Sequence, residues 1–400
     1  MSKFKDLVNY CLNCTVKPCR KGCPLENDIP KFIKLAKDGD FLEAFSVLGE
    51  TTVLSSICGR ICPFDRQCEG NCVRRLKGEP VQIGKIEAII GDKAIQEGYP
   101  IFRNMKEING KKIAIVGAGP SGLTCAAFLK KLGYSVTIYE KYDYLGGIIS
   151  HGIPDFRLDK DITLKNLNRI VDLGIEVKYN FELGKNITLK ELKKEYDAVF
   201  LAFGANVSNM PQIKGKNLSN VYGANELLES KKALDLKNKN VIVVGGGDVA
   251  MDMARTAKRW GGNVLVIYRR DENKMKADIN QINLAKEEKV EFLFNTNVKQ
   301  IIKKENISKA YLVTNDGFKF IYPCDYVFFA IGSKPNEKIN KKLGLKLDVD
   351  GYIKTDKKQM TSMKGVFAGG DLTGTERTVA YAARSGREAA YNIDLYLTKR

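Results

Sequence analysis

Short runs of consecutive apolar residues alternate with amphipathic stretches over most of the chain after residue 110. In residues 111–140 the run IAIV is followed by a glycine-rich turn, a helical pattern and a second apolar run. Residues 238–270 repeat this order, beginning with the run VIVV. Buried parallel strands are typically continuous apolar runs, and strand, turn, helix and strand form one βαβ unit. The pattern therefore predicts two βαβ units.

The first hundred residues have a different pattern. Residues 29–48 carry apolar residues at spacings of three and four, which is typical of amphipathic helices. We therefore predict an α/β protein in which a helical domain precedes two doubly wound dinucleotide-binding domains. The predicted boundaries are 1–105 for the helical domain, 106–236 and 326–400 for the two parts of the first dinucleotide-binding domain, and 237–325 for the second.

Composition agrees with a multidomain globular protein. The chain has 400 residues, more than one hydrophobic core normally organises, and 44% of them are hydrophobic. The formal net charge is +18, but the lysines are dispersed rather than gathered into one basic tract, and the sequence has no nucleic-acid-binding motif. It also has no apolar signal region at its start and no run of 18 apolar residues. We expect a cytoplasmic protein that binds neither nucleic acid nor membrane.

The first glycine turn has the form that binds a dinucleotide. Its glycines permit a tight turn, close approach of a pyrophosphate and packing of the helix on the strand. Glu140 ends the next apolar run, where its carboxylate would accept hydrogen bonds from ribose hydroxyls and repel a 2′-phosphate. This site therefore predicts FAD or NAD. Its candidate residues are Gly117, Gly119, Pro120, Ser121, Gly122, Glu140 and Lys141.

The second glycine turn differs at the position that distinguishes the ligands. Its second apolar run ends in Tyr268, Arg269 and Arg270 where an acidic residue would stand in an NAD site. Two guanidinium groups suit a dianionic 2′-phosphate, which predicts NADP(H), although both arginines could also be solvated surface residues. The candidate residues are Gly245, Gly247, Asp248, Val249, Ala250, Arg269 and Arg270.

A chain with both types of site is expected to pass hydride between nicotinamide and flavin. Disulfide reductases of this plan need a dithiol beside the flavin, but Cys125 and Cys324 are the cysteines that follow Cys72, and they are far apart in sequence. We interpret both as small buried residues. The chemistry that follows the flavin must therefore lie elsewhere.

Eight of the ten cysteines precede residue 73, in two groups. Disulfides are rare in the cytoplasm, so this clustering indicates metal or redox chemistry. The first group has the spacing C-x2-C-x4-C-x3-C-P, which is similar to the ferredoxin run. The alternative is zinc, whose sites usually contain two well-separated pairs. We favour iron–sulfur clusters. The groups are Cys11, Cys14, Cys19 and Cys23, and Cys58, Cys62, Cys68 and Cys72.

Four segments of the sequence resemble one enzyme family. They are residues 58–87, 144–160, 243–272 and 365–390, and the match runs from about Cys11 to Leu397. The family is that of the small (beta) subunit of NADPH-dependent glutamate synthase. Its relatives include the flavin and iron–sulfur part of dihydropyrimidine dehydrogenase and the large subunit of NADH-dependent ferredoxin:NADP oxidoreductase. The resemblance departs at Lys276, where the family commonly has proline.

The resemblance implies two [4Fe-4S] clusters with interleaved ligands in the helical domain. One cluster would take Cys11, Cys14, Cys19 and Cys72 as its four ligands. The other would take Cys23, Cys62, Cys68 and Glu87, and Glu87 would be the eighth ligand of the two clusters together. Counting thiols alone would instead select Cys58. A carboxylate ligand to iron is chemically acceptable, but thiolate is the usual one, so the alternative stays open.

The resemblance also extends the predicted cofactor sites. It implies FAD contacts from residues around the isoalloxazine and from a terminal helix whose N-terminus faces the flavin. These candidates are Leu145, Gly146, Gly147, Gly152, Ile153, Arg157, Gly370, Asp371, Thr378 and Val379, with Gly204 and Gly332 completing the cofactor-binding set.

The implied function is that of an NADPH-dependent FAD and iron–sulfur oxidoreductase that passes single electrons to a protein partner with a second active site. The implied partner is a glutamate synthase-type large subunit. The alternatives are the FMN-containing subunit of a dihydropyrimidine dehydrogenase, or a ferredoxin. A different class of protein, a zinc-bearing nucleotide-binding redox sensor without turnover, would give a colourless preparation.

Overall fold

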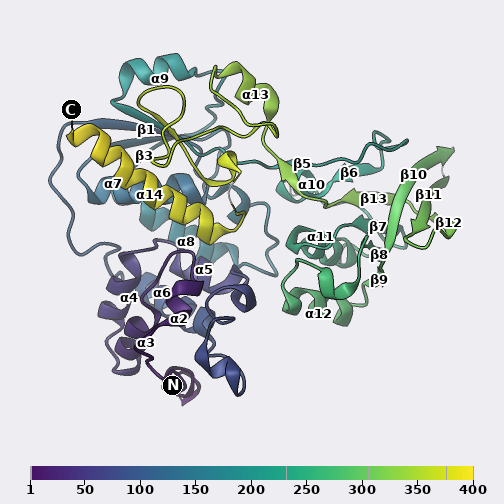
Figure 1. Ribbon diagram of the computed structural model, residues 1–400, viewed down its shortest axis with the longest axis horizontal. Coiled ribbons are helices and arrows are strands. Elements are labelled where there is room, and N and C mark those ends of the chain that lie inside the picture. Colours follow the sequence, from purple (N-terminus) through teal and green to yellow (C-terminus); the bar gives the residue numbers. More distant parts are fainter. Residues whose placement is uncertain (1, 231, 305–306, 375, 400) are drawn as a thin grey trace. The chain divides into compact units, whose positions relative to one another are not determined.

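The computed structural model describes residues 2–230, 232–304, 307–374 and 376–399 (Figure 1). The chain forms two compact units. Unit 1 comprises Met1–Ser150, Asp155–Gly204 and Pro335–Arg400, and unit 2 comprises His151–Pro154 and Ala205–Lys334. Both cysteine groups and the first glycine turn therefore belong to unit 1, and the second glycine turn belongs to unit 2. Among the described residues, no helix combines the length and apolarity that a membrane span needs.

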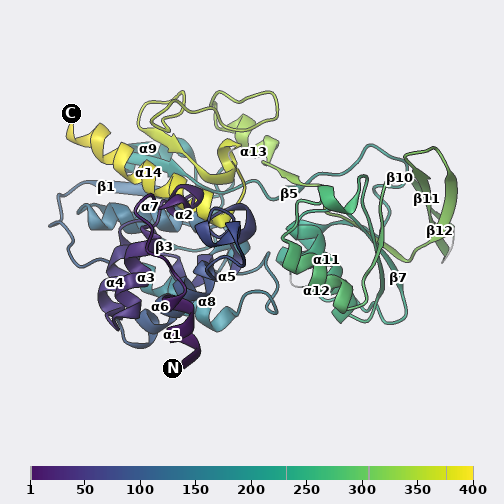
Figure 2. The same ribbon diagram turned by 60° about the horizontal axis from the view of Figure 1, so that its bottom comes forward.

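The segment before the first strand of unit 1 is helical, as predicted. The expected helical pattern of residues 29–48 forms two helices, because Gly39 has a φ of +86° and Asp40 caps the second helix by accepting a hydrogen bond from the Glu43 N–H at 3.0 Å. The helices of this segment lie together in unit 1 (Figure 2). Phe32, Ile57 and Ile86 are fully buried in this region. The helices are α1 (Ser2–Asn9), α2 (Pro18–Gly22), α3 (Ile29–Lys37), α4 (Phe41–Gly49), α5 (Ser55–Ile61), η1 (Phe64–Arg66), η2 (Val73–Leu76) and α6 (Ile83–Gln96).

The rest of unit 1 is built on a parallel sheet of order β15-β4-β1-β2-β3. The predicted first βαβ unit forms β1, α7 and β2. The sheet consists of β1 (Lys112–Val116), β2 (Ser135–Tyr139), β3 (Glu176–Lys178), β4 (Ala198–Leu201) and β15 (Val366–Ala368). The accompanying helices are α7 (Pro120–Lys131), η3 (Gly147–Ile149), α8 (Lys160–Val171), α9 (Leu189–Glu195), α13 (Glu337–Lys342), η5 (Gly370–Thr373) and α14 (Val379–Thr398).

Helices α7 and α14 lie side by side in unit 1 (Figure 1). A Cβ atom on Gly386 of α14 would lie 2.1 Å from the carbonyl oxygen of Ser121 on α7. A Cβ on Gly122 would lie 1.9 Å from the carbonyl oxygen of Gly117. Glycine at these two positions therefore allows α14, α7 and the first glycine turn to pack without a gap.

Gly386→Ala is expected to lower the free energy of unfolding by about 1–3 kcal/mol, because the added methyl group must push α14 away from α7. Leu395→Ala on the same helix, where Leu395 is 36% exposed, is the control and should change stability much less. Thermal denaturation measures both. Equal stability of Gly386→Ala and the native chain would contradict the close packing.

Unit 2 repeats the doubly wound plan with a parallel sheet of order β6-β13-β7-β8-β9. The elements of this sheet and its helices are β6 (Val221–Gly223), α10 (Ala224–Ser230), β7 (Asn240–Val244), α11 (Asp248–Arg259), β8 (Asn263–Ile267), η4 (Glu272–Lys274), α12 (Ile279–Glu287), β9 (Glu291–Leu293) and β13 (Tyr326–Phe329). Antiparallel strands complete the unit: β5 (Val207–Ser208) with β14 (Ser333–Lys334), and β10 (Thr296–Lys304), β11 (Ile307–Thr314) and β12 (Lys319–Pro323). Two parallel sheets with helices confirm the predicted α/β class.

Candidate cofactor sites

The first glycine turn joins β1 to α7 at the carboxyl end of β1, which lies between β4 and β2 in the sheet. The strand order reverses at this point. Gly117 has a φ of +104°, and a Cβ there would lie 2.7 Å from the carbonyl oxygen of Ala202, just after the neighbouring strand β4. A Cβ on Gly119, in contrast, would meet no atom within 4 Å. Open space in front of a helix N-terminus is where a pyrophosphate binds in such sheets. Gly204 (φ +75°) follows β4 at the same edge.

Ser121 provides a second test of whether this site fits a phosphate-bearing cofactor. Its side chain is buried, and its Oγ has no hydrogen-bond partner among the described residues. Buried hydroxyls are normally hydrogen-bonded. An oxygen atom of a bound ligand would satisfy this hydroxyl, so the first turn fits the predicted cofactor.

Glu140, at the end of β2, is 5% exposed and reaches back to the glycine turn. Its Oε2 accepts a hydrogen bond from the Ala118 N–H at 2.7 Å, and its Oε1 accepts one from the Tyr142 N–H at 3.0 Å. Burial raises the pKa of Glu140, while these N–H groups oppose the rise. Each carboxylate oxygen has a further lone pair for a ribose hydroxyl. Lys141 is exposed and lies over the ring of Tyr142.

Two distant segments of the predicted FAD set converge on the start of α7. The Gly146 N–H donates to the carbonyl oxygen of Ala118 at 2.8 Å, and a Cβ on Gly147 would lie 3.5 Å from the Cα of Gly119. A Cβ on Gly370 would lie 2.9 Å from the Cβ of Ser121. The structure therefore brings Gly146 and Gly370, 224 positions apart, to one turn. Leu145, next to Gly146, is buried.

Asp371 follows Gly370 in η5. Burial raises the pKa of its carboxyl to about 6. Thr378 is the N-cap of α14, where its Oγ1 accepts from the Tyr381 N–H at 3.3 Å, and Val379 is the first residue of that helix. A carboxyl and a helix N-terminus thus both belong to the segments that follow the last strand of this sheet.

The predicted segment 152–158 is divided between the two units. Gly152 and Ile153 belong to unit 2, whereas Arg157 belongs to unit 1 and is half-buried. Their contact with a flavin stays a prediction.

The second glycine turn repeats the geometry of the first. Gly245 has a φ of +152°, and its Cβ would lie 2.3 Å from the carbonyl oxygen of Ala330, just after the neighbouring strand β13. A Cβ on Gly247, the N-cap of α11, would meet no atom within 4 Å. Asp248 accepts a hydrogen bond from the Asp278 N–H at 2.9 Å. The remaining predicted residues of this edge are Val249, Ala250 and Gly332 (φ +98°).

Arg269 and Arg270 follow β8 on the surface of unit 2. Both side chains are exposed, and neither forms an ion pair with a carboxylate of the described residues. In contrast, Arg255 and Arg259 of the same unit both pair with Glu288, at 2.8 and 2.7 Å. The two guanidinium groups after β8 are thus available to an anionic ligand.

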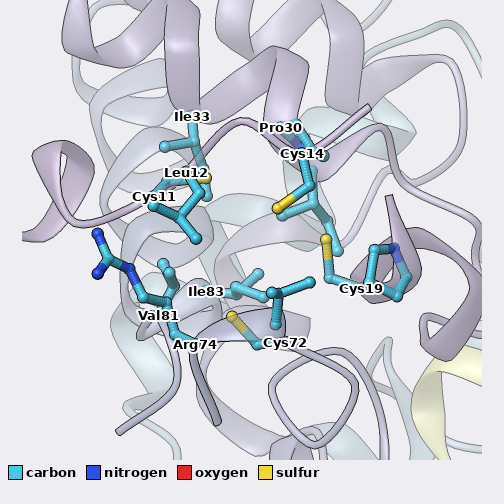
Figure 3. A pocket seen from close by; sticks show the side chains of 13 residues that line it. Cys11, Leu12, Cys14, Cys19, Pro30, Ile33, Cys72, Arg74, Val81 and Ile83 are labelled. Carbon is cyan, nitrogen blue, oxygen red and sulfur yellow. The ribbon is translucent and has the colours of Figure 1, made fainter. Parts of the chain in front are cut away.

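The first predicted ligand set lines one pocket. Cys11, Cys14, Cys19 and Cys72 surround a common space, with Ile33 and Ile83 among the apolar side chains that complete the wall (Figure 3). These cysteines come from the chain before α2, from α2 itself and from the residue before η2. Burial raises the pKa of the Cys19 thiol to about 11.

The second predicted set also gathers, and Cys58, the alternative to Glu87 as the eighth ligand, lies beside it. Cys23, Cys58 and Cys68 are buried, and Glu87 is 6% exposed. The thiols of Cys58 and Cys62 are hydrogen-bonded, which with burial raises the pKa of Cys62 well above its usual range. Burial raises the pKa of Glu87 to about 8, and the carboxylate acts electrostatically on three of the thiols.

Within the part of the chain that the structure describes, no three His, Cys, Asp or Glu side chains converge closely enough to hold a single metal ion. The four thiols of the first set instead line one pocket (Figure 3). Thiolate-lined space is what an iron–sulfur cluster requires. Cys125 and Cys324 are buried, as the sequence predicts, at 0% and 3% exposure.

Sequence reasoning missed the residues that hold the second set in place. Asn27 donates a hydrogen bond to Glu87, and Thr51 donates one to Asn27. Arg384 and Arg387 of α14 bind the chain that follows Cys23. These residues are 24 to 362 positions apart in sequence. No motif spacing links them, so the sequence alone carried no signal for the contacts.

Comparison with known proteins gives two family matches. The family described as pyridine nucleotide-disulphide oxidoreductase matches residues 111–386, and that described as dihydropyrimidine dehydrogenase domain II, 4Fe-4S cluster, matches residues 4–99. The NADPH glutamate synthase small chain of Escherichia coli (strain K12) is 35% identical, over 97% of this chain and 90% of the relative. That of Azospirillum brasilense is 34% identical, over 98% and 89%.

Solved structures add a likeness of fold. Mycobacterium tuberculosis FprA in complex with NADPH has a TM-score of 0.62 and 19% identity, and the match covers 72% of this chain and 85% of that one.

Proposed function

Because the chain belongs to the pyridine nucleotide-disulphide oxidoreductase family, and to the group of the NADPH glutamate synthase small chains, we propose that this oxidoreductase carries electrons from NADPH through FAD and two [4Fe-4S] clusters to a protein partner. The observation that supports this most strongly is that both cysteine groups belong to the same compact unit as the first glycine turn. The chemistry supplied by these groups when bound is the conversion of a hydride pair into single electrons.

We assign FAD to unit 1 on the basis of its residues. Gly119 leaves room for a pyrophosphate, and Ser121 has a buried hydroxyl to donate to it. Glu140 accepts hydrogen bonds and carries negative charge, which favours ribose hydroxyls over a 2′-phosphate. The N-terminus of α14 adds partial positive potential. These side chains bind and orient the cofactor rather than react.

NADPH is assigned to unit 2, because its glycine turn repeats the geometry of the first and β8 is followed by two arginines that pair with no carboxylate of the described residues. Guanidinium groups bind a phosphate dianion through charge-assisted, often bidentate hydrogen bonds. The exposed position of Arg269 and Arg270 supports a role in selecting NADPH.

The order of the two clusters is supported by the contacts of the C-terminal helix. Arg387 of α14 donates to the carbonyl oxygens of Leu25 and Thr51, so the helix that begins beside the FAD segments binds the chain next to Cys23. The cluster held by Cys23, Cys62, Cys68 and Glu87 would therefore be the one nearer the flavin. The cluster held by Cys11, Cys14, Cys19 and Cys72 would be nearer the partner.

The surface over the first cysteine pocket supports contact with an acidic protein. Leu12, Val73 and Arg74 line this pocket, and Leu12 and Val73 are 53% and 36% exposed. Leu76, two positions after Arg74, is 83% exposed. Exposed apolar side chains that lie together mark interaction sites. Lys77, next to Leu76, is exposed as well. An acidic partner with its own electron-accepting centre suits an apolar surface bordered by basic residues.

Leu76→Asp is expected to weaken binding to the partner by about 10–100-fold, since it puts a charge at an apolar contact and opposes an acidic surface. Reduction of ferricyanide by NADPH, which needs no partner, should stay unchanged. Val349→Asp, at a residue that is 99% exposed elsewhere in unit 1, is the control. Biosensor titration of the partner against each variant measures the effect, and equal affinities would exclude this surface.

The proposed function is tested on anaerobically purified full-length chain. Bound FAD, acid-labile sulfide and bleaching on addition of NADPH are the expected results. A colourless preparation that contains zinc would instead favour the nucleotide-binding redox sensor. Absence of flavin or of sulfide would overturn the proposal.

The identity of the partner is tested by co-purification and substrate. Oxidation of NADPH in the presence of glutamine plus 2-oxoglutarate supports the glutamate synthase-type large subunit, and oxidation with uracil supports the FMN-containing dehydrogenase subunit. Reduction of ferredoxin without either substrate supports the third alternative.

A further inference from the structure

Asn27 lies between two polar side chains in the interior of the helical region. It is 1% exposed, and its Nδ2 donates to the Oε1 of Glu87 at 3.4 Å. The hydroxyl of Thr51 donates to the Oδ1 of Asn27 at 2.5 Å. A contact this short fits O–H···O but lies below the usual range of N–H···O. The amide oxygen therefore faces Thr51, and the amide NH₂ faces the carboxylate.

This orientation has a consequence for Glu87. A hydrogen bond donated to one oxygen of a carboxylate fixes the direction in which the other oxygen faces. The Asn27 amide supplies that hydrogen bond to one oxygen and leaves the other available. Replacing a residue that holds a metal ligand in this way typically lowers metal affinity by about 10–100-fold.

Arg387 fixes both sides of this contact from another part of the chain. Its Nη1 donates to the carbonyl oxygen of Leu25 at 2.9 Å and to that of Thr51 at 2.7 Å. Leu25 stands midway between Cys23 and Asn27, and Thr51 carries the hydroxyl that orients the amide. One guanidinium on α14 therefore connects the chain on each side of the amide.

We propose that Asn27 and Thr51 form a positioning pair that holds Glu87 as a ligand of the second cluster, and that Arg387 couples this pair to α14. This inference rests on the proposed function, in which Glu87 is the eighth ligand. The pair acts through Glu87 and does not itself contact iron.

The test uses two substitutions that differ in one hydroxyl. Thr51→Val keeps the shape of threonine but cannot donate, whereas Thr51→Ser keeps the hydroxyl. In anaerobically reduced full-length protein, Thr51→Val is expected to change the electron paramagnetic resonance signal of the second cluster and to lower its reduction potential, because the carboxylate loses its oriented donor. Loss of its iron to a chelator should be about tenfold faster or more.

The first cluster serves as the internal control in every sample. Its signal should be the same in the native chain, Thr51→Val and Thr51→Ser, and Thr51→Ser should restore the second signal. Asn27→Leu should reproduce Thr51→Val, and Arg387→Gln should change the second signal in the same direction. If Asn27→Leu does not fold, the two Thr51 variants still decide.

Glu87→Ala separates this inference from the proposal on which it rests. If Glu87→Ala leaves the second signal unchanged, the ligand assignment fails. If Glu87→Ala alters that signal but Thr51→Val does not, the assignment stands and the positioning pair is overturned. A Thr51→Val variant that alters both clusters equally also overturns it, because the effect would then be on folding.

Discussion

Replacing Arg269 and Arg270 together by alanine is expected to raise the KM for NADPH by about 100-fold or more. Hydrogen bonds to charged groups are worth about 1.5–3 kcal/mol each, and tenfold in affinity corresponds to about 1.4 kcal/mol. Both side chains are exposed after β8, and neither pairs with a described carboxylate, so the variant leaves no buried charge behind. The loss should therefore fall on binding and not on folding.

NADH provides the comparison that makes this result specific. It lacks the 2′-phosphate, so its KM should change by less than about threefold in the same variant. Steady-state reduction of ferricyanide measures both nucleotides without a partner. Arg259→Ala, which removes an arginine paired with Glu288 in the same unit, is the control. An equal loss for both nucleotides would show that the arginines act on the fold, and the assignment of NADPH to unit 2 would lose its basis.

The sequence predicted those parts of the molecule in which neighbouring residues determine the structure. The apolar run, glycine turn and helical pattern of residues 111–140 form β1 (Lys112–Val116), α7 (Pro120–Lys131) and β2 (Ser135–Tyr139). Both glycine turns are local signals, because the steric need for glycine arises within one βαβ unit. The family assignment follows from the same local motifs, and comparison with known proteins confirms it.

The sequence could not predict contacts that depend on how distant segments pack. Gly370 meets Ser121, and Arg387 meets Leu25, across 249 and 362 positions. A glycine or an arginine has no feature in the sequence that identifies such a partner. Both contacts depend on the packing of α14 against α7. This packing is close because Gly386 has no side chain to keep the two helices apart. The tertiary contacts thus determine which polar groups approach the second cysteine set.

The choice between Glu87 and Cys58 shows the same limit at one site. Spacing alone gives four cysteines in the second group, and all of them have thiols to offer. Glu87 acts electrostatically on Cys23, Cys62 and Cys68, whereas Cys58 acts on Cys23 and Cys62, so proximity to those two thiols does not separate the candidates. What distinguishes them is the support of neighbouring groups: Glu87 has an amide donor in Asn27, whereas Cys58 is hydrogen-bonded to another thiol.

Single cysteine substitutions should therefore remove one cluster at a time. Cys14→Ala is expected to lose about half of the iron and acid-labile sulfide, from the cluster of the first pocket, and Cys68→Ala the other half. Electron transfer to the partner should fall by at least about 100-fold in both, because the proposed function places the two clusters in series. Cys125→Ala, which removes a buried cysteine of α7, should retain all of the iron.

Cys58→Ser and Glu87→Ala decide the eighth ligand in the same measurement. If Glu87 is the ligand, Cys58→Ser should retain the full iron content and both resonance signals, whereas Glu87→Ala should lose or alter the second cluster. A buried carboxylate is stable when it accepts a hydrogen bond and binds a cation, and the alanine variant leaves the second cluster without its fourth protein ligand. Loss of iron in Cys58→Ser with a normal Glu87→Ala would assign the thiolate instead.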